Sequence, residues 1–182
     1  MCVYSEIVKP TQQLHDLCHS LWLDNITLGH LTSRILQGYI DDLSVTGLTS
    51  NPSIFDLAVK NSKFYDDAIR QKSGEGKSGE ALFFDLAIED LTQAADLFHP
   101  IYDATGGADG WVSLEVSPLL AYDAAGTVKA AAQLRAQAHR HNLFIKIPGT
   151  REGLTAVEES IFAGVPVNVT LLFSSAQYIA AA

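Results

Sequence analysis

Strand-like and helix-like segments alternate along the whole of this sequence. Short segments rich in β-branched and aromatic residues predict strands at 20–24, 44–50, 111–116, 143–147 and 166–173. Apolar residues at helical spacing predict helices at 3–19, 27–39, 53–60, 61–72, 78–100, 124–140 and 152–163. Because long connections that each hold a helix join strands running in the same direction, the sequence predicts a parallel sheet of βα units.

Each predicted strand has one apolar face, and its other face carries a polar residue near the carboxyl end. In the third strand, Val112 and Leu114 alternate with Ser113 and Glu115. The strands of an open doubly wound sheet are apolar on both faces, whereas a closed barrel carries its catalytic residues at the carboxyl ends of its strands. The pattern therefore favours a TIM (β/α)8 barrel, an α/β fold, with these residues at its catalytic end: Asp24, Asn51, Glu115, Lys146, Asn168 and Thr170.

Lys146 is the least expected residue in its segment, because it interrupts an apolar run. In a strand it shares a face with Phe144, while Leu143, Ile145 and Ile147 point to the other side. Burial of an ammonium group favours the neutral amine, a nucleophile that attacks carbonyl compounds and forms Schiff bases. Lys146 is therefore a candidate for covalent catalysis. The alternative is a lysine whose side chain extends from the strand end into water.

The other polar residues also have structural interpretations when each is taken alone. Asp24 and Asn51 can cap helices, Glu115 can be a solvated strand end, and Asn168 and Thr170 can form hydrogen bonds in the core. Beside a lysine, however, two carboxylates and two amides on adjacent inner faces are explained more simply as a Schiff-base site.

Composition narrows the class of protein. The chain has 182 residues, 47% hydrophobic and 18% charged, which suits one globular domain spanning residues 1–182. Its net charge of −9 disfavours a nucleic-acid partner and an anionic membrane surface. No apolar run reaches the roughly 18–20 residues of a membrane span, and no secretory leader opens the chain. Since Cys2 and Cys18 are too few for a disulfide scaffold, we expect a cytoplasmic protein.

Three segments are similar to signatures of the transaldolase family: Gly47–Phe55, Ile145–Gly153 and Val167–Ser174. The resemblance extends over residues 10–182, and stretches such as Val112–Pro118 resemble the longer bacterial branch of that family. It implies reversible transfer of a dihydroxyacetone unit between sugar phosphates in the non-oxidative pentose phosphate pathway. The implied substrates are sedoheptulose 7-phosphate and glyceraldehyde 3-phosphate, and the products are erythrose 4-phosphate and fructose 6-phosphate.

The same resemblance implies a role for each candidate residue. Lys146 matches the Schiff-base lysine, and Glu115 matches the carboxylate that acts through a water during dehydration of the carbinolamine. Asp24 matches the acid/base at the C3–C4 bond. The residues that hydrogen-bond the dihydroxyacetone moiety and position that water are matched by Asn51, Asn168 and Thr170. No metal and no cofactor is implied.

The length of the chain leads to a further expectation. A complete barrel has eight strands and typically about 250 residues, whereas five strands are predicted here and the sequence ends in a helical segment, 178–182. We therefore expect a barrel truncated after about five βα units, without the family's phosphate-binding arginines and with open edges that favour self-association. The alternatives are an aldolase of the same family that acts on fructose 6-phosphate and releases dihydroxyacetone, and a non-catalytic fragment that binds a sugar or a protein.

Overall fold

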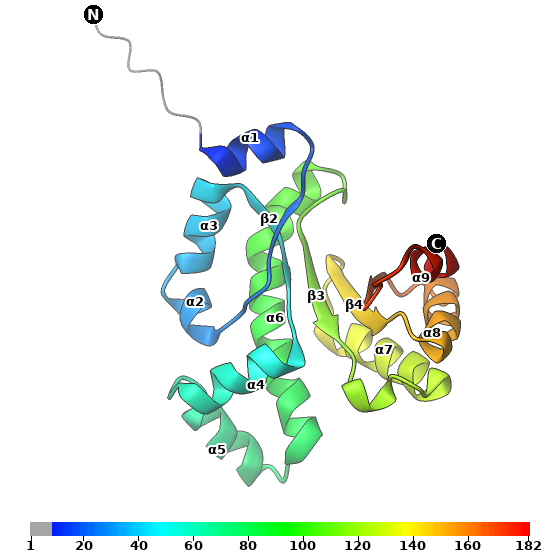
Figure 1. Cartoon of the computed structure of the whole chain (residues 1–182). Coiled ribbons are helices and arrows are strands. Elements are labelled where there is room, and N and C mark those ends of the chain that lie inside the picture. The colour runs from blue at the N-terminus through cyan, green and yellow to red at the C-terminus, as the bar shows by residue number, and fades with distance from the viewer. Residues whose placement is uncertain (1–8) are drawn as a thin grey trace, which may run out of the picture.

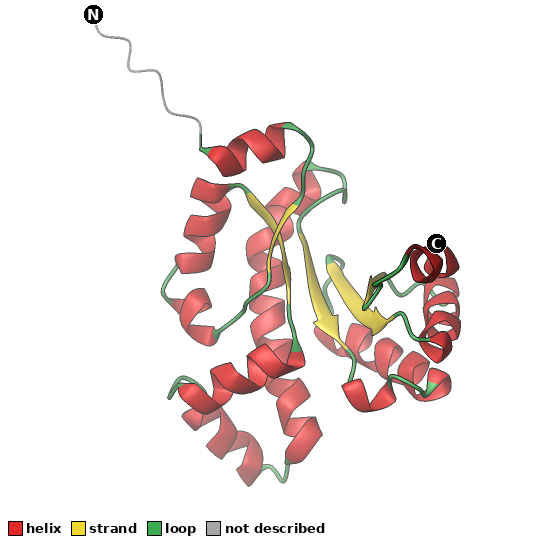
Figure 2. Ribbon diagram, in the orientation of Figure 1, coloured by secondary structure: helices red, strands yellow, loops and turns green. Residues whose placement is uncertain are grey.

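A computed structural model describes residues 9–182 and shows parallel strands alternating with helices (Figure 1; Figure 2). Its strands are β1 (Leu21–Leu23), β2 (Val45–Thr49), β3 (Trp111–Glu115), β4 (Leu143–Pro148) and β5 (Val167–Thr170). They pair in the order β1-β2-β3-β4-β5, so each strand lies beside its neighbours in sequence. A doubly wound sheet reverses its strand order at a switch point, whereas a barrel keeps the sequential order. The sheet curls into a half-barrel, which confirms the predicted fold class.

Helices connect successive strands and cover the outer face of the sheet. In Figure 1, α6 runs behind β2 and β3, while α7 and α8 lie beside β4. The carboxyl ends of β2 and β3 point to the lower end of that view, where α4 and α5 also lie. The helices are α1 (Pro10–Asp16), α2 (Leu28–Thr32), α3 (Ile35–Leu43), α4 (Pro52–Asn61), α5 (Asp66–Gly74), α6 (Gly79–Ala104), the 3-10 turn η1 (Pro118–Leu120), α7 (Ala124–Ala138), α8 (Arg151–Phe162) and α9 (Ser175–Ala181).

Two predicted helices have different limits in the structure. The helix predicted at 27–39 starts as expected after Thr27, but it is divided into α2 and α3 because Arg34 adopts a left-handed conformation with φ 62°. The helix predicted to end at residue 100 continues through Pro100 to Ala104. Proline removes one helical hydrogen bond there, and the packing of the fully buried Phe98 holds the helix together around it.

Other boundaries also shift. The last strand ends at Thr170 rather than at residue 173, because Leu171 has a left-handed φ of 62° that an extended strand does not allow. The helix predicted at 61–72 begins at Asp66. Of the helix predicted at 3–19, the structure describes the part from residue 9 onward and shows α1; residues 3–8 and Cys2 lie outside the described residues.

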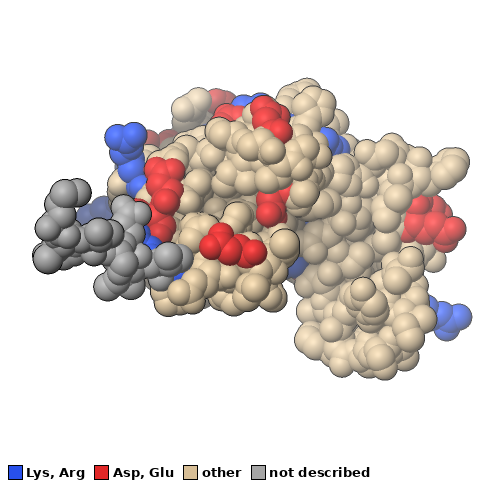
Figure 3. All heavy atoms as spheres, turned by 90° about the horizontal axis from the view of Figure 1, so that it is seen from above, with Lys and Arg blue, Asp and Glu red and all other residues tan. Residues whose placement is uncertain are grey.

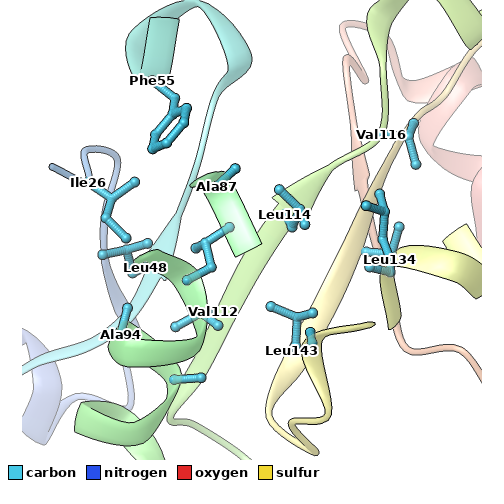
Figure 4. Close-up of a cluster of buried hydrophobic side chains, with 14 of the residues drawn as sticks. Ile26, Leu48, Phe55, Ala87, Ala94, Val112, Leu114, Val116, Leu134 and Leu143 are labelled. Carbon is cyan, nitrogen blue, oxygen red and sulfur yellow. The ribbon is translucent and has the colours of Figure 1, made fainter. Parts of the chain in front are cut away.

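The outer face of the sheet is buried beneath the helices. Figure 4 shows Leu48 and Val112 close to Ala94 of α6, whose small side chain lets the helix approach the sheet. Burying a side chain of leucine size contributes about 1.5–3 kcal/mol. Phe144 and Lys146, on the opposite face of β4, stay partly exposed, which confirms the predicted alternation. These outward-facing side chains have 0% exposure: Leu48, Val112, Leu143, Ile145 and Ile147.

Aromatic rings occupy the inner face of the sheet near the amino ends of the strands. Trp111 stacks on Phe144 with ring centroids 3.9 Å apart, and Trp22 lies 6.3 Å from the same ring. The indole of Trp22 rests on the bare backbone of Gly47, where an added Cβ would come within 2.5 Å of the ring. The rings therefore cover the inner face near the amino ends of the strands. The polar residues of the inner face lie nearer the carboxyl ends.

Charged side chains are scattered over the one face of the molecule that Figure 3 shows. On the face in Figure 3, which looks down from the top of Figure 1, acidic side chains form separate groups and basic side chains lie apart from one another. Among the described residues, no helix is both long and apolar enough to cross a membrane.

A buried hydrogen-bonded chain joins α2, α5 and α6. The hydroxyl of Tyr65, the residue just before α5, donates to Asp90 Oδ2 at 2.6 Å and accepts from the backbone N–H of Leu28 at 2.9 Å. Tyr65 is 1% exposed and Asp90 3% exposed. Burial raises the pKa of Asp90 to about 6, and the hydrogen bond from Tyr65 offsets this effect only in part. An ionised Asp90 therefore costs folding free energy near neutral pH.

We expect Asp90→Asn to change how stability depends on pH. The pKa of Asp90 in the folded state lies above the ordinary value of 3.8. Its contribution to the stability of the fold is therefore complete at low pH and is lost as the pH rises through about 6. Asparagine cannot ionise and still accepts the Tyr65 hydrogen bond. The free energy of unfolding of the variant, relative to that of the parent protein, should therefore rise by roughly 2 kcal/mol between pH 4 and pH 7. Urea unfolding across this range measures the difference, and a difference that does not vary with pH would contradict the assignment.

Candidate active site

Lys146 and Glu115 face each other on the inner side of the half-barrel, at the carboxyl ends of β4 and β3. The two residues are direct neighbours in the register of these strands. The ammonium Nζ of Lys146 lies 3.2 Å from Glu115 Oε2, and the side chains are 12% and 14% exposed. The lysine therefore does not extend into water. It forms an ion pair that is largely shielded from solvent, with an amine and a carboxylate within reach of one another.

This ion pair is not fully satisfied by the protein. Glu115 Oε2 is close to the ammonium but is not aligned with it as a hydrogen bond, and it has no other hydrogen-bond partner among the described residues. The ammonium donates one long hydrogen bond of 3.5 Å to the backbone oxygen of Ser50. A buried carboxylate oxygen without a donor is a favourable place for a bound water or a substrate group.

Asn168 lies on the other side of Lys146, as its register partner on β5. Its amide nitrogen donates to Ser113 Oγ on β3 at 3.2 Å. The backbone oxygen of Ser113 accepts from both the N–H and the hydroxyl of Ser50, at 3.0 and 2.9 Å. Hydrogen bonds thus link the residue after β2, the middle of β3 and the first half of β5 near the lysine. Thr170, two residues beyond Asn168 on the same face, is partly exposed at the end of β5.

Asn51 serves as the N-cap of α4, as one structural interpretation expected. Its side-chain oxygen accepts from the N–H of Ser53 at 2.9 Å, and its amide nitrogen makes no hydrogen bond with the described residues. Asn51 and Glu115 both line a small cavity between α4, α6 and β3. Because the cap uses the oxygen alone, the amide nitrogen can still donate to a ligand.

Asp24 lies one residue beyond β1 and is exposed. Leu23 pairs with Leu48, so Asp24 is level with Thr49 at the same end of the sheet. It makes no hydrogen bond or ion pair with the described residues, and in particular it does not contact Lys146. The structure therefore brings together Lys146, Glu115 and Asn168, and it places Asp24 at the rim of the same surface.

Two contributors to the site were not among the predicted residues. Ser113 shares the strand face of Glu115, so the alternation pattern could have identified it. Ser50 contacts Lys146 through its backbone oxygen, which every residue has and no sequence pattern marks. Among the described residues, no group of three or more His, Cys, Asp or Glu side chains is arranged to hold a metal ion.

A separate cavity of about 450 Å³ opens beside these strand ends, between α4, the start of α6 and η1. Its lining includes Pro52, Glu80, Phe83 and Ser117, and it does not include Lys146 or Glu115. The contact between Lys146 and Glu115 therefore lies outside this cavity.

The chain matches the family model described as Transaldolase/Fructose-6-phosphate aldolase over residues 21–182. It is 43% identical over 172 residues to a protein named Transaldolase from Arthrobacter sp. (strain FB24), a match that covers 94% of this chain and 46% of that relative. It is 44% identical over 167 residues to a Transaldolase from Thiobacillus denitrificans, covering 92% of this chain and 46% of the relative. It is 39% identical over 178 residues to Transaldolase 1 from Streptomyces avermitilis, a match that covers 98% of this chain and 47% of that relative. The chain thus spans about half the length of the curated relatives it matches.

We expect removal of one member of the Lys146–Glu115 pair to destabilise the fold. Lys146→Met keeps the aliphatic stem but leaves Glu115 as a shielded, uncompensated charge, so the free energy of unfolding should fall by roughly 1–3 kcal/mol. Adding Glu115→Gln removes that charge and should recover most of the loss. Urea unfolding of the parent, both single variants and the double variant measures the coupling.

The control for this double-mutant cycle of Lys146 and Glu115 is Lys129→Met. Lys129 is exposed on α7 and should tolerate the change. Equal stability of Lys146→Met and Lys129→Met would show that the ion pair does not contribute to the fold.

Proposed function

This chain belongs to the transaldolase/fructose-6-phosphate aldolase family, and we propose that its inner-face residues form the Schiff-base part of a transaldolase active site. The proposed reaction is reversible transfer of a dihydroxyacetone unit between sugar phosphates, as in the non-oxidative pentose phosphate pathway. The observation that carries the proposal is the Lys146–Glu115 pair, a shielded amine beside a shielded carboxylate at the catalytic end of the strands.

Formation of the imine needs a neutral amine and a group that moves protons. Glu115 Oε2 lies 3.2 Å from the Lys146 ammonium without being aligned as a hydrogen bond, so the carboxylate takes a proton from the ammonium through a bound water or after a small rotation of the side chains. The free amine then attacks C2 of the ketose phosphate, forming a C–N bond while the C=O π bond breaks. A proton passes from the attacking nitrogen to the former carbonyl oxygen, which becomes the hydroxyl of a carbinolamine. The proton held by Glu115 returns to this hydroxyl, which leaves as water. A protonated imine on Lys146 remains.

Cleavage of the C3–C4 bond needs a second acid/base, and we assign this role to Asp24. Its carboxylate accepts the proton of the C4 hydroxyl while the electrons of the C3–C4 bond move into the protonated imine. An aldehyde phosphate leaves, and an enamine stays attached to Lys146. Addition to an acceptor aldehyde runs these steps in reverse. The exposed position of Asp24 at the rim suits a group that acts on the part of the substrate farther from the imine.

The remaining polar residues suit the hydroxyl groups of the dihydroxyacetone unit. Asn168 stands beside Lys146 in the register, and the amide nitrogen of Asn51 is free to donate among the described residues. Thr170 follows on the same face as Asn168, and we assign its hydroxyl to positioning the water that Glu115 uses. The proposed substrates are thus ketose phosphates and aldose phosphates of the cytoplasm.

The description of the matching family also includes fructose-6-phosphate aldolase. An aldolase hydrolyses the enamine-derived imine and releases dihydroxyacetone, whereas a transaldolase holds the enamine until an aldehyde arrives. Analysis of the products formed from fructose 6-phosphate, with and without erythrose 4-phosphate, separates the two activities.

We expect borohydride to trap the imine on Lys146. Incubating the full-length protein with fructose 6-phosphate and borohydride should add a reduced dihydroxyacetone unit to one lysine, which peptide mass mapping locates. The Lys146→Met variant should lose the label, and Lys129→Met should keep it, because Lys129 is exposed on an outer helix. Labelling of Lys129 or of another lysine in place of Lys146 would refute the assignment.

We expect Asp24→Asn to separate imine formation from turnover. The variant keeps Lys146 and Glu115, so borohydride trapping should remain detectable, while transfer should slow by roughly 10²–10⁴, the usual effect of removing an acid/base group. Asp41→Asn, which changes an exposed carboxylate on α3, is the matched control and should leave transfer unchanged. Normal turnover of Asp24→Asn would show that another group moves this proton.

A further inference from the structure

Tyr65 contacts the segment that carries Asp24, although it is far from Asp24 in sequence. Its hydroxyl accepts a hydrogen bond from the backbone N–H of Leu28, the first residue of α2, at 2.9 Å. Leu28 follows Asp24 by four residues. Because Asp24 makes no hydrogen bond or ion pair with the described residues, its position depends on the chain on either side: β1, which pairs with β2, and the anchors that follow Asp24.

Two anchors hold this short segment. Ile26 is 2% exposed and is part of the hydrophobic core. The N–H of Leu28 is one of the first N–H groups of α2, which have no acceptor within the helix. The Thr27 side chain caps His30 and not Leu28, so the hydroxyl of Tyr65 provides the acceptor that Leu28 needs.

Asp90 determines which way the hydroxyl of Tyr65 points. The hydroxyl has a single hydrogen, and it donates that hydrogen to Asp90 Oδ2 at 2.6 Å. Its lone pairs then face the N–H of Leu28. Asp90 belongs to the long helix α6, which packs on β2 and β3, so the bridge ties the segment after β1 to the rigid outer layer of the barrel.

The ring of Tyr65 is also fixed from the side of α4. It packs edge-on against Phe55 with ring centroids 5.6 Å apart, and Phe55 is 2% exposed on the helix that Asn51 caps. The neighbouring residue, Phe64, lies so close to α2 that a Cβ on Gly29 would come within 3.0 Å of its ring. Tyr65 thus lies at a buried junction of the segments that follow β1 and β2.

We propose that Tyr65 is a positioning residue for the reaction proposed above, because its hydroxyl, oriented by Asp90, holds the segment between β1 and α2 that carries Asp24. This inference rests on the proposed function. Tyr65 does not touch the substrate; it acts by holding the segment that carries Asp24 in place at the rim of the inner face. Displacement of a catalytic group by about 1 Å can slow a reaction by roughly 10²-fold.

The test compares Tyr65→Phe, Asp90→Asn and the double variant Tyr65→Phe with Asp90→Leu. Tyr65→Phe keeps the ring and removes the acceptor for Leu28, so hydrogen exchange at the Leu28 amide should become roughly tenfold faster or more, and kcat should fall roughly 10- to 100-fold at constant KM. Imine trapping on Lys146 should persist. Asp90→Asn still accepts from the hydroxyl and should keep both exchange protection and kcat.

The double variant separates positioning from stability. Leucine at position 90 removes the buried carboxylate that Tyr65→Phe leaves without a donor, so thermal stability should recover while kcat and Leu28 protection stay low. Recovery of kcat together with stability would overturn the proposal, and so would unchanged exchange at Leu28 in Tyr65→Phe. Failure of the parent protein to form a trapped imine would instead refute the proposed function, and the exchange experiment would still decide whether Tyr65 holds this segment.

Discussion

The structure depends on the two-residue alternation of side chains along its parallel strands. Each strand gives one face to the helices and the other to the interior, and sequential pairing brings equivalent positions level. Glu115, Lys146 and Asn168 are adjacent for this reason alone. A slip of one residue in β4 would bury the lysine among the helices and expose Ile145 and Ile147, so the apolar core and the polar site require the same register.

Alternation is a local property, and for that reason the sequence predicted much of the fold and the inward direction of several candidate site residues. The faces of β3 and β4 follow from neighbouring residues, and with them the inward directions of Glu115 and Lys146. Element boundaries were less predictable, because single backbone conformations decide them. Arg34 divides one predicted helix and Leu171 shortens the last strand, because both residues adopt left-handed φ angles. Neither residue type favours this conformation, so the sequence did not predict it.

The remaining features depend on contacts between distant segments. Trp22 rests on Gly47 because β1 pairs with β2, and Tyr65 meets Leu28 and Asp90 through packing of three helices. Contacts between segments that are distant in sequence leave no periodic pattern, so the sequence did not predict these pairs. Asn51 shows a related limit, since one side chain caps α4 with its oxygen and leaves its nitrogen for another partner, so the structural and functional interpretations of this residue are compatible.

We propose that the inner face of this half-barrel presents Lys146 as a carbonyl-reactive amine with Glu115 as its proton partner. A crystal structure of the full-length protein after exposure to fructose 6-phosphate is the decisive experiment. We expect continuous electron density from Lys146 Nζ to C2 of a dihydroxyacetone unit, flanked by the side chains of Glu115 and Asn168. A bound ketose phosphate elsewhere in the barrel, with the Lys146–Glu115 contact still at 3.2 Å, would show that Lys146 is not the reactive amine.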